Sequence, residues 1–83
     1  MLRHPVDLSA HIPVLPPFAA EIAEVCSRFK CTITLEQENI VLNLKSMIGL
    51  LSQQLPQNGL LTLVTDGDDE GDAMNALLPL LAG

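Results

Sequence analysis

Two short segments in which apolar residues occupy every second position constrain the fold of this chain most. Residues 31–36 and residues 40–44 both show this period-two alternation, which is typical of strands with one buried face. Residues 37–39, Gln-Glu-Asn, separate the segments and supply turn-forming side chains. The two segments are therefore predicted to form a β-hairpin, which rules out an all-helical fold.

Helical and strand patterns flank this hairpin on both sides. Residues 18–29 carry apolar side chains at helical spacing and follow a proline-rich stretch, so a first amphipathic helix is predicted there. Residues 6–10 alternate and predict a first strand, whereas residues 60–65 are apolar on both faces and predict a central strand. The whole chain, residues 1–83, is expected to form a single α+β domain.

Two further helices complete the predicted order of strand, helix, strand, strand, helix, strand, helix. A short helix is predicted from Ser46 to about residue 54, stopped by Pro56. A last helix is predicted from the spacing of apolar residues between Met74 and Leu81. Pro79 lies inside this helix and is expected to end or kink it near residue 78, because proline lacks the N–H that a helix interior requires.

Composition excludes several classes of function. A net charge of −6 with four Lys and Arg residues argues against nucleic-acid binding, because few cations are present to neutralise phosphates. No apolar run is long enough to cross a bilayer, and the first residues lack the continuous apolar region of a secretory signal, so a cytoplasmic location without membrane insertion is expected. Cys26 and Cys31 do not make a disulfide framework and are expected to be buried or half-buried thiols in a reducing compartment.

An acidic run at residues 66–72 resembles part of a calcium-binding loop. The twelfth position of such a loop would need a bidentate glutamate, but the residue there is Leu77. Acidic residues at the N-terminus of a helix explain the run more simply. Neither a metal nor a cofactor is expected.

The residues that follow Ser46 form an uncharged apolar segment. Ser46 is predicted to cap the short helix, since its hydroxyl can accept an N–H of the first turn. Met47, Ile48 and Leu51 are then either buried or presented to a partner.

Several of these residues together resemble a known family. The matching residues are the Ala19-Ala20 pair, Phe29, the Asn-Leu-Lys-Ser-Met-Ile-Gly segment at 43–49, Gly67, Asp69-Glu70 and residues 72–77. In this register the chain resembles HPr, the histidine-containing phosphocarrier of the bacterial phosphotransferase system, without gaps over nearly its whole length. The resemblance implies an open-faced sandwich, in which a four-stranded antiparallel sheet is covered on one face by three helices.

The chain departs from this family at the position that carries phosphate. The resemblance places the phosphate-accepting histidine on Leu15 and a nearby arginine on Pro17. A phosphohistidine needs an imidazole nucleophile, a cation and free amides at a helix start. Leu15 removes the first, Pro17 removes the second, and Pro16 and Pro17 remove two amides. His11 is the only nearby histidine, and it is expected to be an ordinary loop residue.

The resemblance also proposes two sites at the Ser46 segment. Ser46 aligns with the regulatory phosphoserine of Gram-positive members, and Met47, Ile48 and Leu51 align with an exposed patch that docks partner proteins. Lys45 is expected to assist a phosphate on Ser46.

Three functions remain open from the sequence. The leading hypothesis is a non-catalytic, HPr-like protein that binds partners of the phosphotransferase or catabolite-control network. An alternative is similarity to the catabolite-repression HPr paralogue, regulated by phosphorylation at Ser46. An acyl-carrier-like protein is the alternative from another class, although its serine would need a preceding aspartate where this chain has Lys45. No residue constellation supports enzymatic activity.

Overall fold

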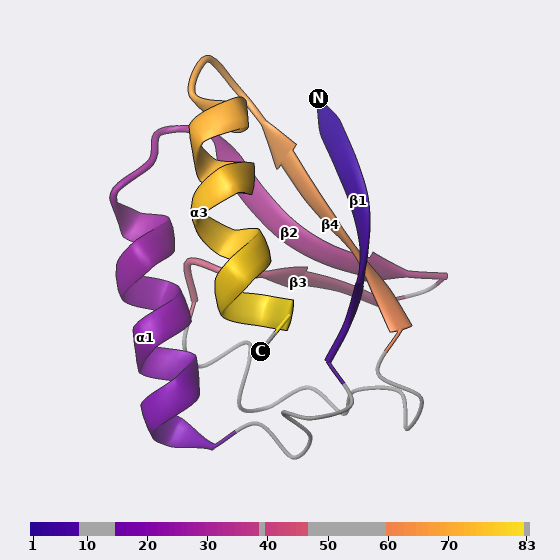
Figure 1. The fold of residues 1–83 in the computed structure, drawn as a ribbon, viewed down its shortest axis with the longest axis vertical. Coiled ribbons are helices and arrows are strands. Elements are labelled where there is room, and N and C mark those ends of the chain that lie inside the picture. The colour runs from indigo at the N-terminus through magenta and orange to yellow at the C-terminus, as the bar shows by residue number, and fades with distance from the viewer. Residues whose placement is uncertain (9–14, 39, 47–59, 83) are drawn as a thin grey trace.

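The computed structural model describes residues 1–8, 15–38, 40–46 and 60–82, and Figure 1 shows their arrangement. In these ranges the chain forms strands β1 (Leu2–Asp7), β2 (Thr32–Gln37), β3 (Ile40–Asn43) and β4 (Leu60–Asp66), and helices α1 (Pro16–Ser27) and α3 (Glu70–Ala82).

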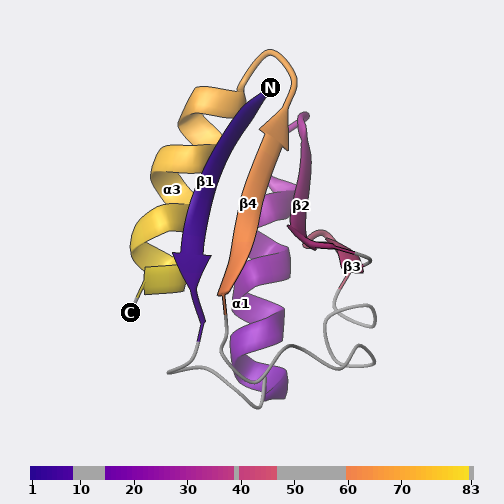
Figure 2. The same cartoon turned by 90° about the vertical axis from the view of Figure 1, so that its right-hand side faces the viewer.

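The four strands form one antiparallel sheet in the order β1-β4-β2-β3. Both helices pack on the same face of this sheet, and Figure 2 shows the two-layer arrangement from the side. Leu35 of β2 pairs with Leu63 of β4 on one side and with Leu42 of β3 on the other. All three leucines are buried, so this row of the sheet faces the helices. The predicted α+β class with a four-stranded antiparallel sheet is confirmed.

The core lies between the sheet and the two helices. Its largest fully buried side chains come from every layer: Leu8, Ile22, Ile33, Leu35, Leu44, Leu63, Leu77 and Leu81. Thr65 is the buried polar side chain of the described residues, and its hydroxyl donates to the backbone carbonyl of Glu70 at 3.0 Å. This bond satisfies the hydroxyl and ties the end of β4 to the first turn of α3.

The predicted hairpin and central strand are confirmed, but the predicted first strand is shifted. β2 and β3 pair up to Gln37 and Ile40, and β4 lies between β1 and β2. β1 runs from Leu2 to Asp7 rather than over residues 6–10, because its pairing with β4 already begins at Leu2. Pro5 is compatible with this strand because β1 is at the sheet edge, where a missing N–H costs no ladder bond.

Pro79 was expected to end or kink the last helix near residue 78, and it does not end it. α3 continues to residue 82, with Pro79 exposed in its last turns. Leu77 and Leu81 on either side of the proline are fully buried, and this burial holds the final turn against the sheet despite one lost backbone bond. Within the described residues there are two helices rather than three; the short helix predicted after Ser46 falls outside the described residues.

Candidate functional site

The start of α1 is where the family resemblance places the phosphate acceptor. Leu15 is the N-cap residue, with an extended backbone and no side-chain bond to the helix, and its side chain is 60% exposed. Pro16 and Pro17 are the first helical residues, and their fixed φ suits the first turn. The backbone of α1 closes behind them, since the N–H of Ala19 donates to the carbonyl of Leu15 at 3.0 Å.

This arrangement removes two of the donors that usually make a helix start an anion site. The first amides of a helix point outward and bind phosphate or carboxylate groups. Here two of these positions are prolines without an N–H, and the Ala19 N–H is already used within the helix. Residues 15–20 also contain no charged side chain. The exposed surface at this end of α1 is therefore apolar, formed by Leu15, Pro16 and Pro17.

The second predicted site lies at the turn that follows β3. The Ser46 N–H donates to the carbonyl of Asn43 at 3.1 Å, and the Lys45 N–H donates to the Asn43 side-chain oxygen at 2.9 Å. Ser46 itself is half-buried. The predicted docking residues Met47, Ile48 and Leu51, and the histidine nearest to Leu15 in the sequence, His11, lie outside the described residues.

Lys45, which is expected to assist a phosphate on Ser46, has a hydrogen-bond partner of its own. Its ammonium donates to the backbone carbonyl of Phe29 at 2.7 Å, just beyond the end of α1. This contact is partly buried, so the lysine already holds a specific partner far away in the sequence. Sequence spacing alone had suggested only its proximity to Ser46.

The two cysteines lie close to the same end of α1. Both are free and buried, which confirms the expectation of burial. Burial raises the pKa of the Cys26 thiol to about 12, although the charge of Lys45 opposes the rise. Burial also raises the pKa of Cys31, followed by its hydrogen bond to Asp69. At neutral pH both groups are therefore protonated and unreactive.

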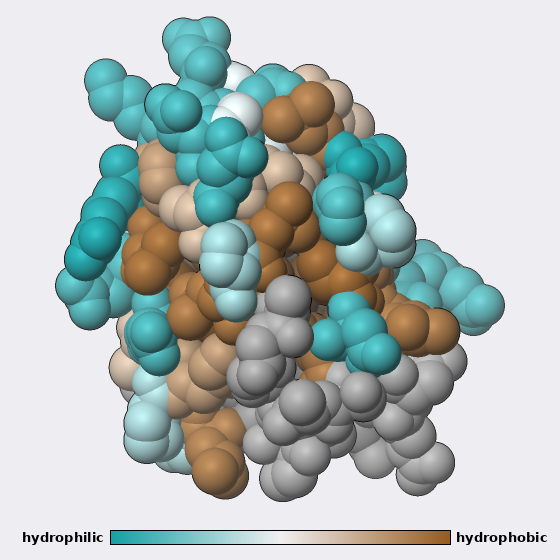
Figure 3. All heavy atoms as spheres, viewed as in Figure 1, coloured by the Kyte–Doolittle hydropathy of each residue, from teal (hydrophilic) through white to brown (hydrophobic). Residues whose placement is uncertain are grey.

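The acidic run acts largely on the protein's own backbone. Asp69 accepts the N–H of Lys30 at 2.8 Å and that of Cys31 at 2.9 Å, and these bonds lower its pKa. Glu70 accepts the N-terminal ammonium at 2.9 Å and the N–H of Gly67 at 3.3 Å. Within the described residues, no three His, Cys, Asp or Glu side chains form a group that could hold a metal ion. Figure 3 shows hydrophilic side chains gathered over the turn into α3, at the top of the view.

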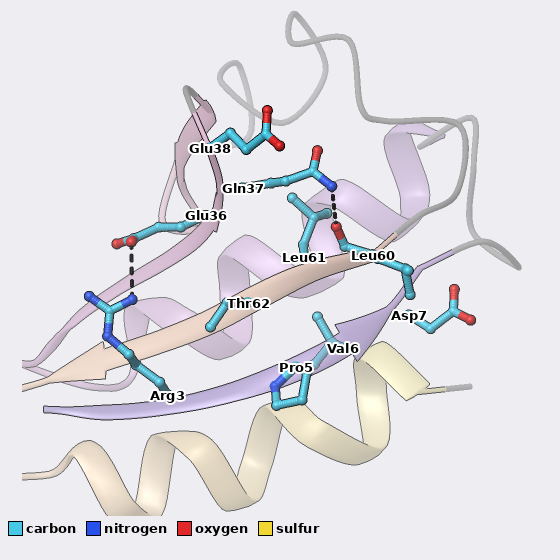
Figure 4. A pocket seen from close by; sticks show the side chains of 10 residues that line it. All are labelled: Arg3, Pro5, Val6, Asp7, Glu36, Gln37, Glu38, Leu60, Leu61 and Thr62. Atoms are coloured by element: carbon cyan, nitrogen blue, oxygen red, sulfur yellow. Dashed lines mark hydrogen bonds and ion pairs between the residues drawn. The ribbon is translucent and has the colours of Figure 1, made fainter.

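The sheet also carries a hollow that the sequence patterns did not identify. It has a volume of about 560 Å³ and is lined by residues of β1, β2 and β4, among them Arg3, Pro5, Glu36 and Thr62. Figure 4 shows Arg3 and Glu36 pointing toward each other, with 3.4 Å between the guanidinium nitrogen and the carboxylate oxygen. Pro5, Thr62 and Glu36 share one row of the sheet. Only the strand register brings them together, and alternation within single strands cannot supply that register.

Comparison with known proteins agrees with this architecture. Residues 18–82 match the family model described as the PTS HPr component phosphorylation site. The chain is 35% identical over 63 residues to the HPr-like protein Crh of Halalkalibacterium halodurans. The matched residues make up 76% of this chain and 75% of the relative. The chain belongs to the HPr family.

Solved structures show the same fold. HPr-C-His from Thermoanaerobacter tengcongensis superposes with a TM-score of 0.84 at 28% identity, covering 98% of this chain and 91% of that one. Crh from Bacillus subtilis, described as a domain-swapped dimer, superposes with a TM-score of 0.75 at 25% identity, covering 98% and 86%. The four-stranded sheet that these proteins share is incompatible with the all-helical acyl-carrier alternative. No helix among the described residues has the length and apolar character needed to span a membrane.

Proposed function

We propose that this protein is a cytoplasmic, non-enzymatic member of the HPr family that binds partner proteins without carrying phosphate on a histidine. The observation that carries the proposal is the start of α1, where an exposed Leu15 is followed by two prolines. Within residues 15–20, this position offers no nucleophile, no cation and two fewer amides than an ordinary helix start. The family match begins at residue 18, immediately after these three residues, which is consistent with their divergence.

The partner-binding surface of the proposal is the segment after Ser46. It comprises Met47, Ile48 and Leu51, carried on a third helix that starts near Ser46 and joins the two described helices on the same face of the sheet. The partners are proteins of the phosphotransferase or catabolite-control network. Met and branched aliphatic side chains suit such a surface, because they adapt to different apolar partners.

The test compares capture of these proteins from native cytosol by three forms of the chain. The wild type should retain phosphotransferase or catabolite-control proteins, identified by mass spectrometry, and the Met47→Asp, Ile48→Asp double variant should lose them. Val41→Asp is the matched control, because Val41 is an exposed apolar residue of β3, 63% accessible, outside the proposed surface. Capture that survives the double substitution would refute the assignment of this surface.

A second function is regulation by phosphorylation at Ser46, as in a catabolite-repression HPr paralogue. It is favoured by the 35% identity to Crh and by the position of Ser46 at the end of an ordered turn. A phosphate at a helix start is stabilised by the helix dipole and by free amides.

Incubation with an HPr kinase tests this second function. One phosphate should be added, Ser46→Ala should abolish the addition, and Ser27→Ala, a change at an exposed serine of α1, should leave it intact. An unmodified Ser46, under conditions in which a genuine HPr is phosphorylated, would refute this regulation.

A further inference from the structure

The C-terminal end of α1 takes its positive charge from a distant residue. A helix C-terminus carries a partial negative charge that Lys or Arg side chains in the last turn commonly balance. α1 has no basic residue in its last turn, and Arg28, which follows, pairs with Glu24 at 3.0 Å. The ammonium of Lys45 instead reaches the end of the helix and donates to Phe29.

The same lysine is bound into the turn that presents Ser46. Asn43 accepts the Lys45 N–H with its side chain and the Ser46 N–H with its backbone carbonyl. Two hydrogen bonds therefore hold the backbone of residues 43–46, while the long side chain of Lys45 extends to α1. One residue thus connects the candidate phosphorylation site to the end of the helix.

We propose that Lys45 is a positioning residue whose ammonium holds the end of α1, and that negative charge at Ser46 draws this ammonium from the Phe29 carbonyl. This link between the charge at Ser46 and the end of α1 rests on the proposed function in one respect: phosphorylation of Ser46 is the natural source of the negative charge. A phosphate carries about −1.5 to −2 charges at neutral pH and competes more strongly for an ammonium than a neutral carbonyl does.

Movement of the Lys45 ammonium away from Phe29 is expected to affect the two buried thiols, Cys26 and Cys31. The Cys26 carbonyl accepts the Phe29 N–H at 3.2 Å, so the residue whose carbonyl Lys45 holds is bonded directly to the backbone of Cys26. The charge of Lys45 also acts on the pKa of both Cys26 and Cys31, which places all three groups in one region. When Lys45 leaves, the end of α1 opens more often and the thiols become accessible.

The test measures how fast an aromatic disulfide reagent labels the thiols. Ser46→Asp supplies a negative charge, and Ser46→Asn supplies a side chain of the same shape without charge. Labelling should be at least about five-fold faster in Ser46→Asp than in Ser46→Asn, because a charge-assisted bond is lost at the helix end. Amide hydrogen exchange of Arg28 and Phe29, whose N–H groups close the helix end, should accelerate in parallel.

Substitution of Lys45 distinguishes an effect that acts through the Lys45 ammonium from a general loss of stability caused by the Ser46 substitutions. In a Lys45→Met background the Asp and Asn variants should label at equal rates, because no cation remains to be moved. Lys45→Arg should restore the difference, since arginine keeps the charge. The proposal is overturned if the two variants label equally when Lys45 is present, or if their difference persists in Lys45→Met.

These outcomes remain distinct from those of the proposed regulation. A chain that no HPr kinase modifies, yet shows the charge-dependent labelling, would lose the natural trigger and retain the coupling. If Ser46→Asp fails to fold, the same comparison of amide exchange and labelling is made between enzymatically phosphorylated and unmodified wild type, with equal rates again overturning the coupling.

Discussion

The carboxylate of Asp69 accepts the backbone N–H of Cys31 at 2.9 Å, so the turn into α3 is bonded to the residue that precedes β2. Its second oxygen accepts the neighbouring N–H of Lys30 at 2.8 Å. One side chain therefore satisfies two consecutive amides of the connection between α1 and β2. Charge-assisted bonds of this kind are stronger than bonds between neutral groups.

Replacement of Asp69 is expected to lower stability and to flatten its acid dependence. The Lys30 and Cys31 amides hold the pKa of Asp69 below its ordinary value, so the carboxylate stabilises the fold above the unfolded pKa of about 3.9. This contribution is lost as pH falls through the lower, folded-state pKa. Asp69→Asn should have a lower Tm at pH 7 and a smaller further loss below pH of about 4.

Asp68→Asn is the matched control, because Asp68 is exposed and no hydrogen bond or ion pair involves its side chain among the described residues. It should leave both the Tm at pH 7 and the acid dependence close to those of the wild type. Thermal unfolding followed by circular dichroism measures both variants. The measurements run from about pH 3 to about pH 7, because Asp and Glu side chains titrate within this range. Equal losses in the two variants would show that net charge, rather than the Asp69 bonds, sets the acid stability.

Two glycines at the start of α3 should respond in opposite directions. Gly67 has φ of +152°, and a Cβ there would lie 2.7 Å from the Cα and Cβ of Cys31. Gly67→Ala should therefore destabilise the protein by about 1–3 kcal/mol. Gly71 lies in α3 with no atom within 4 Å of an added Cβ, so Gly71→Ala should stabilise it by about 0.5 kcal/mol. Urea denaturation measures both, and a Gly67→Ala variant as stable as the wild type would contradict the close packing.

Local patterns in the sequence were sufficient for most of the fold. The alternation over residues 31–36 and 40–44 predicted β2 and β3, and the apolar residues 60–65 predicted β4, which lies between β1 and β2. The limits of β1 could not be predicted, since its strand begins where pairing with Thr65 begins and not where alternation is clearest. The path of α3 past Pro79 likewise depends on the burial of Leu81, which is a tertiary contact.

The candidate site was only partly predictable. The loss of two amide donors at the start of α1 could be predicted from the sequence, because every proline lacks a backbone N–H. The contact of Lys45 with Phe29 was not, because it joins residues 16 apart through a side chain whose direction the sequence does not specify. The pairing of Arg3 with Glu36 also required the register of three strands.

Stepwise rebuilding of the α1 start should restore phosphate transfer in a fixed order. Leu15→His alone should accept almost no phosphate, because the imidazole would lack a cation and the two amides that Pro16 and Pro17 remove. Adding Pro17→Arg returns a cation and one amide, and adding Pro16→Thr returns the second amide. Each charge-assisted bond to phosphate is worth about 1.5–3 kcal/mol, so the rate should rise at each step.

Transfer from phosphoenolpyruvate through the first enzyme of the phosphotransferase system measures this series. The single variant should be slowest and the triple variant fastest. If Leu15→His alone reached the rate of the triple variant, the two prolines would play no part in the loss of transfer, and the missing imidazole would account for it entirely.

The same transfer reaction, applied to the unmodified chain, tests the central claim most directly. The chain is incubated with phosphoenolpyruvate and the first enzyme, beside a genuine HPr as the positive control, and its intact mass is measured before and after mild acid treatment. We expect the genuine HPr to gain one acid-labile phosphate and this chain to gain none. An acid-labile phosphate on His11 or His4 would contradict the claim, because it would show that the chain carries phosphate on a histidine away from the start of α1.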